Sequence, residues 1–278
     1  MPRFGLATLN HSPLHGLPTQ WQAHLDAAAS AGFDALAPDI FWLRALEQEG
    51  VSLESLASEM RDRGLACMEI AGIAIGSEER TERELAENLR YARVLDAEFV
   101  NARIVEPIDD QIIERVKRCA IAFRQEGAAV GGTRVALEFS RGTNLNGVSQ
   151  TLDLTYAVGE EGVGVTLDTW HFFLHPDGPD WAALEALPID LLANVQLSDG
   201  VAYGDGEFGP ATMDRRRMPG EGEFDLSRCM RILDARGFDG AVVVEILNAE
   251  ERKSSLEAFA ERAMQASRNG WASGAAGD

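Results

Sequence analysis

Short apolar runs alternate with helix-like stretches along the whole chain, and this rhythm limits the possible folds more than any other feature of the sequence. About eight alternations of roughly 30 residues each are present, which is the order and length of a (β/α)8 barrel. The runs expected to form strands are residues 3–9, 33–40, 65–71, 99–105, 134–140, 163–169, 191–197 and 241–246. The stretches expected to form helices are residues 20–31, 52–63, 78–95, 109–125, 147–158, 180–187, 224–236 and 250–267. We therefore predict an α/β fold, a TIM barrel built as a single domain.

The predicted barrel domain covers residues 1–268. Residues 269–278 are mostly small and polar, so we expect a flexible C-terminal tail there. A doubly wound open sheet is the alternative to the barrel. Its dinucleotide-binding form is disfavoured because no G-x-G-x-x-G motif follows the first predicted strand.

Four predicted strands in the second half of the chain end in a polar residue, namely Glu138, Asp168, Gln196 and Glu245. The carboxyl ends of parallel barrel strands meet at one face, and active sites lie there. Three carboxylates gathered at this face would repel one another unless a cation or bound protons compensate them. Oxygen ligands of this kind favour Mn2+ or Mg2+, with Co2+ or Zn2+ as alternatives. We predict that these four side chains bind one divalent metal ion.

Each of these residues also has a plainer interpretation. A single acid at a strand end is often one half of a surface ion pair, and only the recurrence of the pattern favours a site. His171 follows Asp168 by three residues and is either a packed imidazole or a substrate contact and general acid/base. Trp170 could form a wall of the pocket, but aromatic residues are more often part of an ordinary core.

Three consecutive arginines, residues 215–217, lie in a long predicted loop. They are either a solvated basic loop that offsets nearby acids, or a source of one guanidinium that grips a substrate oxygen. The segment that follows, Met-Pro-Gly-Glu-Gly, is a weak phosphate-loop candidate because its own acid would oppose a phosphate.

The composition excludes several classes of protein. A net charge of −20 disfavours nucleic-acid and anionic-membrane partners, and no apolar run reaches the ~20 residues of a membrane helix. Only two lysines are present, both in helix-like stretches, which argues against Schiff-base chemistry. The three scattered cysteines indicate reduced core residues. Because no signal peptide is visible either, we expect a cytoplasmic protein.

The strand-end motifs resemble those of the xylose isomerase-like barrel superfamily of sugar isomerases and epimerases. The matching segments are Leu-Glu-Phe at Glu138, Leu-Asp-Thr-Trp-His from Leu167 to His171, Val-Gln-Leu-Ser-Asp from Val195 to Asp199, Arg-Arg-Met-Pro-Gly-Glu-Gly from Arg216, and Val-Val-Glu at Glu245. The resemblance implies that Glu138, Asp168, Gln196 and Glu245 are metal ligands and that His171 and Arg216 contact the substrate. Asp199 and Trp170 are expected beside that substrate as well.

One position departs from this resemblance. Most relatives carry histidine where this chain has Gln196, and glutamine there is similar to one group of 3-dehydroshikimate dehydratases. The endonuclease branch binds several zinc ions through many histidines, and this chain, with five histidines, does not resemble that branch.

The expected substrate is a small sugar or a cyclic hydroxy-ketone. A metal ion would polarise its carbonyl, and Glu138, Glu245 or His171 would remove the adjacent proton to give an enediolate. Return of the proton gives an isomerase or epimerase, which we predict, whereas loss of a β-hydroxyl gives a dehydratase, the alternative. A non-catalytic sugar-binding barrel is the alternative of another class. Barrels of this kind often dimerise, so a homodimer is also considered.

Overall fold

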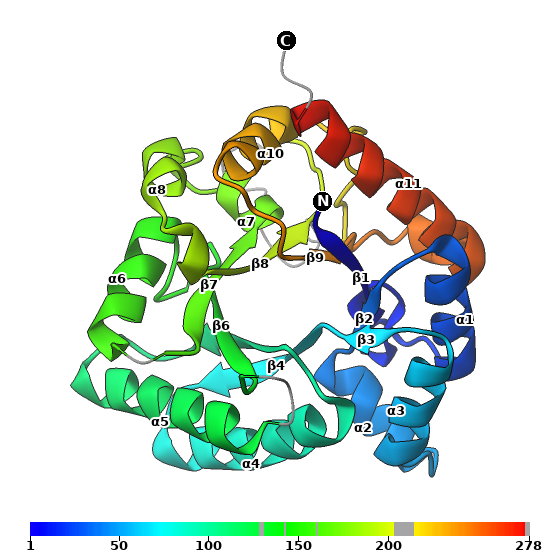
Figure 1. Cartoon of the computed structure of the whole chain (residues 1–278), viewed down its shortest axis with the longest axis horizontal. Helices are drawn as coiled ribbons and strands as arrows, with labels where there is room; N and C mark the ends of the chain where they lie inside the picture. Colours follow the sequence, from blue (N-terminus) through cyan, green and yellow to red (C-terminus); the bar gives the residue numbers. More distant parts are fainter. Residues whose placement is uncertain (128–130, 142, 160, 203–213, 276–278) are drawn as a thin grey trace.

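The strands of this chain are parallel and lie side by side in the order β3-β2-β1-β9-β8-β7-β6-β5-β4. The computed structural model describes residues 1–127, 131–141, 143–159, 161–202 and 214–275. Within them the strands are β1 (Arg3–Ala7), β2 (Ala35–Ala37), β3 (Ala66–Cys67), β4 (Glu69–Ile75), β5 (Phe99–Ile104), β6 (Arg134–Glu138), β7 (Val163–Asp168), β8 (Leu192–Leu197) and β9 (Ala241–Val244). They surround a central axis and the helices form an outer ring, so the predicted (β/α)8 barrel is confirmed (Figure 1).

The third barrel strand is divided into β3 and β4, whereas the sequence predicted one strand over residues 65–71. β3 pairs with β2, and β4 pairs with β5. Met68, between them, donates its N–H to Leu36 O at 2.9 Å and accepts from Phe99 N at 3.0 Å, so it links both neighbours. A bridge between Asp39 and Ala71 closes the barrel at this point.

The helices are α1 (Trp21–Ala31), α2 (Ile40–Gln48), α3 (Leu53–Asp62), α4 (Glu78–Leu95), α5 (Asp110–Glu126), α6 (Val148–Val158), α7 (Thr169–Phe173), α8 (Trp181–Ala186), α10 (Leu226–Ala235) and α11 (Leu256–Ala275). The sequence did not predict α2 or α7. Each begins directly after an acid at a strand end, Asp39 or Asp168, whose carboxylate accepts the first free backbone N–H groups. These N-caps explain why helices start where the sequence suggested continued strand or loop.

Inside the barrel, small and apolar side chains form a floor below the polar strand ends. A separate buried cluster consists of Ala7, Ala35, Ala37, Met68, Phe99, Ala136, Ala193, Ala241 and Val243. Alternate residues of a strand face the same side of the sheet. Ala136 and Val243 face the inside of the barrel, so Glu138 and Glu245, two residues later, face inward as well. The floor closes the barrel below, and the next inward residues form a polar layer at the carboxyl ends.

Helix α11 continues past the residue at which we expected the barrel to end. Trp271 is buried, with its ring 6.4 Å from Phe4 and 5.9 Å from Phe238. The helix therefore extends to Ala275, past residue 269 where the sequence predicted the start of a flexible tail; residues 276–278 lie outside the described part. Among the described helices, none has the length and apolar character needed to cross a membrane.

Candidate metal centre and substrate cavity

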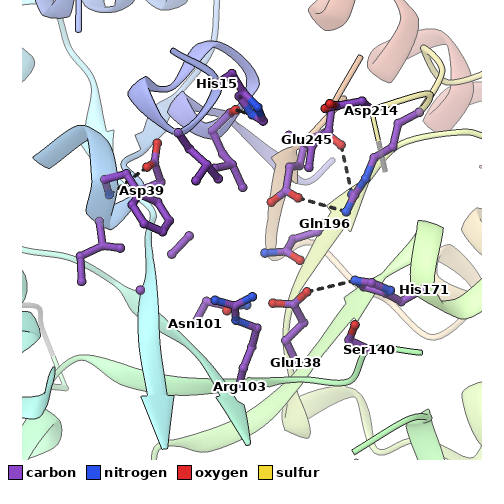
Figure 2. Close-up of a pocket in the computed structure, with 18 residues that line it drawn as sticks. His15, Asp39, Asn101, Arg103, Glu138, Ser140, His171, Gln196, Asp214 and Glu245 are labelled. Carbon is purple, nitrogen blue, oxygen red and sulfur yellow. Dashed lines mark hydrogen bonds and ion pairs between the residues drawn. The ribbon is translucent and has the colours of Figure 1, made fainter. Parts of the chain in front are cut away.

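A cavity of about 380 Å³ opens at the carboxyl ends of the strands (Figure 2). Its polar lining consists of His15, Asp39, Asn101, Arg103, Glu138, Ser140, His171, Gln196, Asp214, Arg216 and Glu245. Leu9, Leu14, Ile40, Phe41 and Leu247 add an apolar part. Three of the four predicted metal ligands therefore line one cavity, and the fourth, Asp168, lies directly behind it, as its contacts show.

Asp168 joins strand β7 to helix α7 and thereby positions His171. Its Oδ1 accepts hydrogen bonds from the backbone N–H groups of Trp170, at 2.7 Å, and His171, at 3.3 Å. The His171 Nε2 atom then lies 3.7 Å from Asp168 Oδ2 and 3.5 Å from Glu138 Oε1. Asp168 is thus the N-cap of α7, and His171 lies in the first turn of that helix. This arrangement places the His171 ring between Asp168 and Glu138.

Arg216 holds two of the carboxylates together. Its Nη1 lies 3.2 Å from Asp168 Oδ2 and its Nη2 lies 3.2 Å from Glu245 Oε1, with only 1% of the arginine side chain exposed. The guanidinium also lies over the ring of Trp170, 5.2 Å from its centre. Arg216 was expected to contact the substrate; it lines the cavity, and its partners in this structure are the two carboxylates.

Gln196 is held from below by a residue that the sequence analysis did not assign to the site. Its Nε2 donates to Glu69 Oε1 at 3.0 Å, while Asn194 Nδ2 donates to Glu69 Oε2. All three side chains are buried. Glu69 stands at the first position of an apolar strand, which is the one signal in the sequence that sets it apart from the surface acids.

The buried acids of this site have strongly perturbed pKa values. Burial raises the pKa of Glu245 to about 7 even though Arg216 lowers it, and burial raises the pKa of Glu69 to about 8 against the hydrogen bonds from Gln196 and Asn194. Burial also acts to raise the pKa of Glu138, but the hydrogen bond and charge of His171 outweigh it and leave that pKa below its usual value. A bound cation would lower all three values.

These groups fit a divalent cation. The buried guanidinium of Arg216 pairs with Asp168 and Glu245 and acts on Glu138 through its charge, so this one buried cation does not balance three carboxylates. Among the described residues, Gln196 Oε1 is buried and takes part in no hydrogen bond, whereas Asp168 Oδ2 meets the guanidinium of Arg216 and the ring of His171. A buried oxygen without a hydrogen bond costs free energy unless a metal ion or water binds it.

His171 offers a second ligand set. One ligand atom each from Glu138, Asp168 and His171 lie within 4.8 Å of one another, close enough to hold one ion. Nitrogen ligation by His171 would favour Zn2+ more than an all-oxygen set would. The sequence predicted His171 as a substrate contact, and the structure also places it among the candidate metal ligands.

Two residues expected at the substrate occupy other places. Asp199 is buried, and its two oxygens accept backbone N–H groups of Gly200, Gly220, Gly222 and Phe224 at 2.8–3.1 Å. It organises the loop that follows Arg216 rather than lining the cavity, and a Cβ on Gly222 would lie 2.2 Å from its Oδ1. Trp170 is fully buried behind His171 and Arg216. Both were expected to contact the substrate, and neither lines the cavity among the described residues; residues 203–213, which precede Arg216, lie outside that part.

Arg103 and Asn101 are cavity residues that the sequence analysis missed. Both come from β5, whose inward face carries Phe99, Asn101 and Arg103 in alternation, and both stand beside Glu138 in Figure 2. Arg103 is exposed and forms no hydrogen bond or ion pair with any other described residue, although its charge lowers the pKa of Glu138. Within the described part of the chain, this guanidinium is therefore available to a group bound in the cavity.

Comparison with known families and proteins agrees with the fold. The family model described as xylose isomerase-like TIM barrel matches residues 25–269. Inosose isomerase of Halalkalibacterium halodurans is 28% identical over 174 residues, which are 61% of this chain and 60% of that protein. Inosose isomerase of Bacillus velezensis is 30% identical over 128 residues, 45% of this chain and 44% of that protein. The matched segments thus span roughly half of these relatives.

Solved structures share the fold over nearly the whole chain at low sequence identity. A protein named IolI, solved with a bound zinc atom, has a TM-score of 0.80 and 17% identity over 97% of this chain and 98% of its own. An L-ribulose 3-epimerase has a TM-score of 0.74 with 18% identity over 99% and 96% of the two chains. A probable 3-DHS dehydratase, AsbF of Bacillus anthracis, has a TM-score of 0.75 with 16% identity over 96% and 99%.

Proposed function

This chain belongs to the xylose isomerase-like TIM barrel family, and from that premise we propose that it is a divalent-metal-dependent isomerase or epimerase of a sugar or related polyhydroxy-carbonyl compound. The convergence of Glu138, Asp168, Gln196 and Glu245 around one buried polar centre carries the proposal. The inosose isomerases matched by sequence support the same reaction class. The localisation in the cytoplasm and a homodimer stay predictions from the sequence.

The proposed metal ligands are the four oxygen-bearing side chains of Glu138, Asp168, Gln196 and Glu245. Carboxylate and amide oxygens favour Mn2+ or Mg2+, whereas a site that recruits His171 would favour Zn2+. When bound, the cation would polarise a substrate carbonyl and make the adjacent C–H bond more acidic.

The proposed proton transfers use groups on opposite sides of the cavity. In Figure 2 Glu138 and Glu245 approach each other from β6 and from the end of β9, with Gln196 between them. The Glu245 carboxylate can accept a proton on one side, and on the other side His171 Nε2 stands 3.5 Å from Glu138 to exchange one with it. Removal of a proton on one side and its return from the other is what epimerisation requires.

Metal analysis followed by proton–deuterium exchange tests this proposal. The purified protein should hold about one equivalent of divalent metal per chain and exchange the carbon-bound proton of a ketose or cyclic hydroxy-ketone in D2O. Glu138→Gln and Glu245→Gln should each lower that exchange at least about 100-fold, the lower end of the range for a lost general base. Exchange that persists in both variants would contradict the assigned proton transfers, and a protein that holds no metal would contradict the proposed site.

Arg103 specifically favours a dehydratase as the second candidate. Arg103 lines the cavity and forms no hydrogen bond or ion pair with any other described residue, so its guanidinium can meet a substrate group. Such a guanidinium suits a substrate that bears a carboxylate. We propose that Arg103→Gln would raise KM for 3-dehydroshikimate at least tenfold and leave KM for neutral ketoses within about twofold, because a charge-assisted hydrogen bond contributes about 1.5–3 kcal/mol. Equal effects on both substrate types, or no consumption of 3-dehydroshikimate, would exclude the dehydratase.

A further inference from the structure

We propose that Glu69 is a positioning residue that orients the side-chain amide of Gln196 so that its oxygen, and not its nitrogen, faces the three carboxylates of the metal centre. This inference rests on the proposed metal site and concerns what makes Gln196 competent as a ligand. Glu69 touches neither the cavity nor the proposed metal position, so its effect passes through Gln196.

The hydrogen bonds around Glu69 leave one orientation for the amide. Glu69 Oε1 accepts from Gln196 Nε2 at 3.0 Å, and Glu69 Oε2 accepts from Asn194 Nδ2, so each oxygen has its own donor. Gln196 Oε1 is then the one polar atom of that side chain with no hydrogen bond among the described residues, and it is buried. Gln196 lines the cavity, where Glu138 and Glu245 also lie.

The reversed amide would be a poor partner on both sides. Its oxygen would face Glu69 Oε1, and with Glu69 ionised, the state that a bound cation favours, two acceptors would be opposed with no proton between them. Its N–H groups would face the metal centre, and an amide nitrogen that carries two protons is not a metal ligand. The acceptor below Gln196 therefore decides which end of its amide faces the metal centre.

The location of Glu69 supports a role beyond packing. Its side chain is fully buried, its strand neighbour is Phe99, and the floor of the barrel around it consists of alanine, valine, methionine and phenylalanine side chains. An acid in such surroundings costs free energy that an apolar residue of similar size would not. Residues that hold a metal ligand in place commonly change metal affinity 10- to 100-fold when they are altered.

The test compares Mn2+ affinity, measured by calorimetry, in the wild type and in Glu69→Gln. The substituted amide can offer its single oxygen to Asn194 or to Gln196 but not to both, so Gln196 can reverse. We expect Mn2+ affinity to fall about 10- to 100-fold while the metal-free protein keeps its circular dichroism spectrum and a cooperative melt. Asp39→Asn is the matched control, because Asp39 is equally buried at the cavity but accepts only from Thr8, Ser12 and the first N–H groups of α2. It should leave Mn2+ affinity within about threefold of the wild type.

A charge-swapped double variant separates orientation from general damage. In Glu69→Gln combined with Gln196→Glu, both oxygens at position 196 are equivalent, and the amide at position 69 donates to one while the other faces the metal. The double variant should recover Mn2+ affinity to at least the wild-type value, whereas Gln196→Glu alone places two carboxylates in contact and should melt at a lower temperature.

The outcomes are distinguishable from a failure of the proposed function. If the wild type binds Mn2+ and Glu69→Gln binds it within about threefold as tightly, or if the double variant does no better than Glu69→Gln, the positioning role is wrong while the metal site stands. If the wild type binds no Mn2+, the proposed metal site and this inference are both wrong.

Discussion

Replacement of Arg216 by methionine should destabilise the metal-free protein severely. The guanidinium lies 3.2 Å from both Asp168 and Glu245, whose side chains are 0% and 7% exposed, so its removal leaves two buried carboxylates with no cation between them. Loss of one partner from a buried ion pair costs about 3–5 kcal/mol. Methionine keeps most of the volume and the contact with the Trp170 ring, so packing contributes little to the change. At roughly 2–3 °C per kcal/mol for a chain of this size, the melting temperature should fall by about 6–15 °C.

Thermal melts of protein stripped of metal, with and without added Mn2+, measure this effect. Arg90→Met is the matched control, because Arg90 also pairs with a carboxylate, that of Glu47, but the two side chains are 47% and 32% exposed and the pair should contribute less than about 1 kcal/mol. Mn2+ supplies the missing positive charge, so it should raise the melting temperature of the Arg216 variant more than that of the wild type.

The pH dependence gives this prediction a sign that can be checked. Arg216 lowers the pKa of Glu245, so in the variant Glu245 holds its proton to higher pH and part of the penalty is relieved in acid. The deficit should therefore grow between pH 6 and pH 8.5. A variant that melts within about 2 °C of the wild type at pH 8 would refute the conclusion that Arg216 compensates the buried carboxylates.

Two further predictions concern the same centre. The pKa values of Glu245 and Glu69 in the folded state are about 7 and about 8, against an ordinary value of 4.5. Protonation of these two acids therefore adds to the free energy of unfolding below about pH 4.5, and this contribution is lost as the pH rises through 7 and 8. Melts of the metal-free wild type should therefore show a melting temperature that declines from pH 5.5 to 8.5, and a flat profile would contradict the raised values. Gln196→Leu should weaken Mn2+ binding at least tenfold, whereas His171→Asn should leave it within about threefold and abolish proton exchange. The reverse order in calorimetry would make His171 the ligand in place of Gln196.

Much of the site could be predicted because its information is local. A residue at a strand end shares the inward face of the residue two positions earlier, so Glu138 follows from Ala136, and Glu245 from Val243. The eight strand–helix alternations predicted the barrel, and the barrel in turn predicted that these ends meet. The boundaries were less certain: the division of the third strand at Met68 and the short helices after Asp39 and Asp168 arise from caps and bridges between neighbours.

The sequence by itself determined the barrel and the polar ends of its strands, because periodicity acts over a few residues and survives without knowledge of the rest of the chain. Tertiary structure alone decided the partners of these groups. Glu69 meets Asn194 and Gln196 across separations of 125 and 127 residues, and Arg216 closes on Asp168 from a different loop. Such pairs leave no periodic trace, since the free energy that selects them comes from burial and charge compensation in three dimensions.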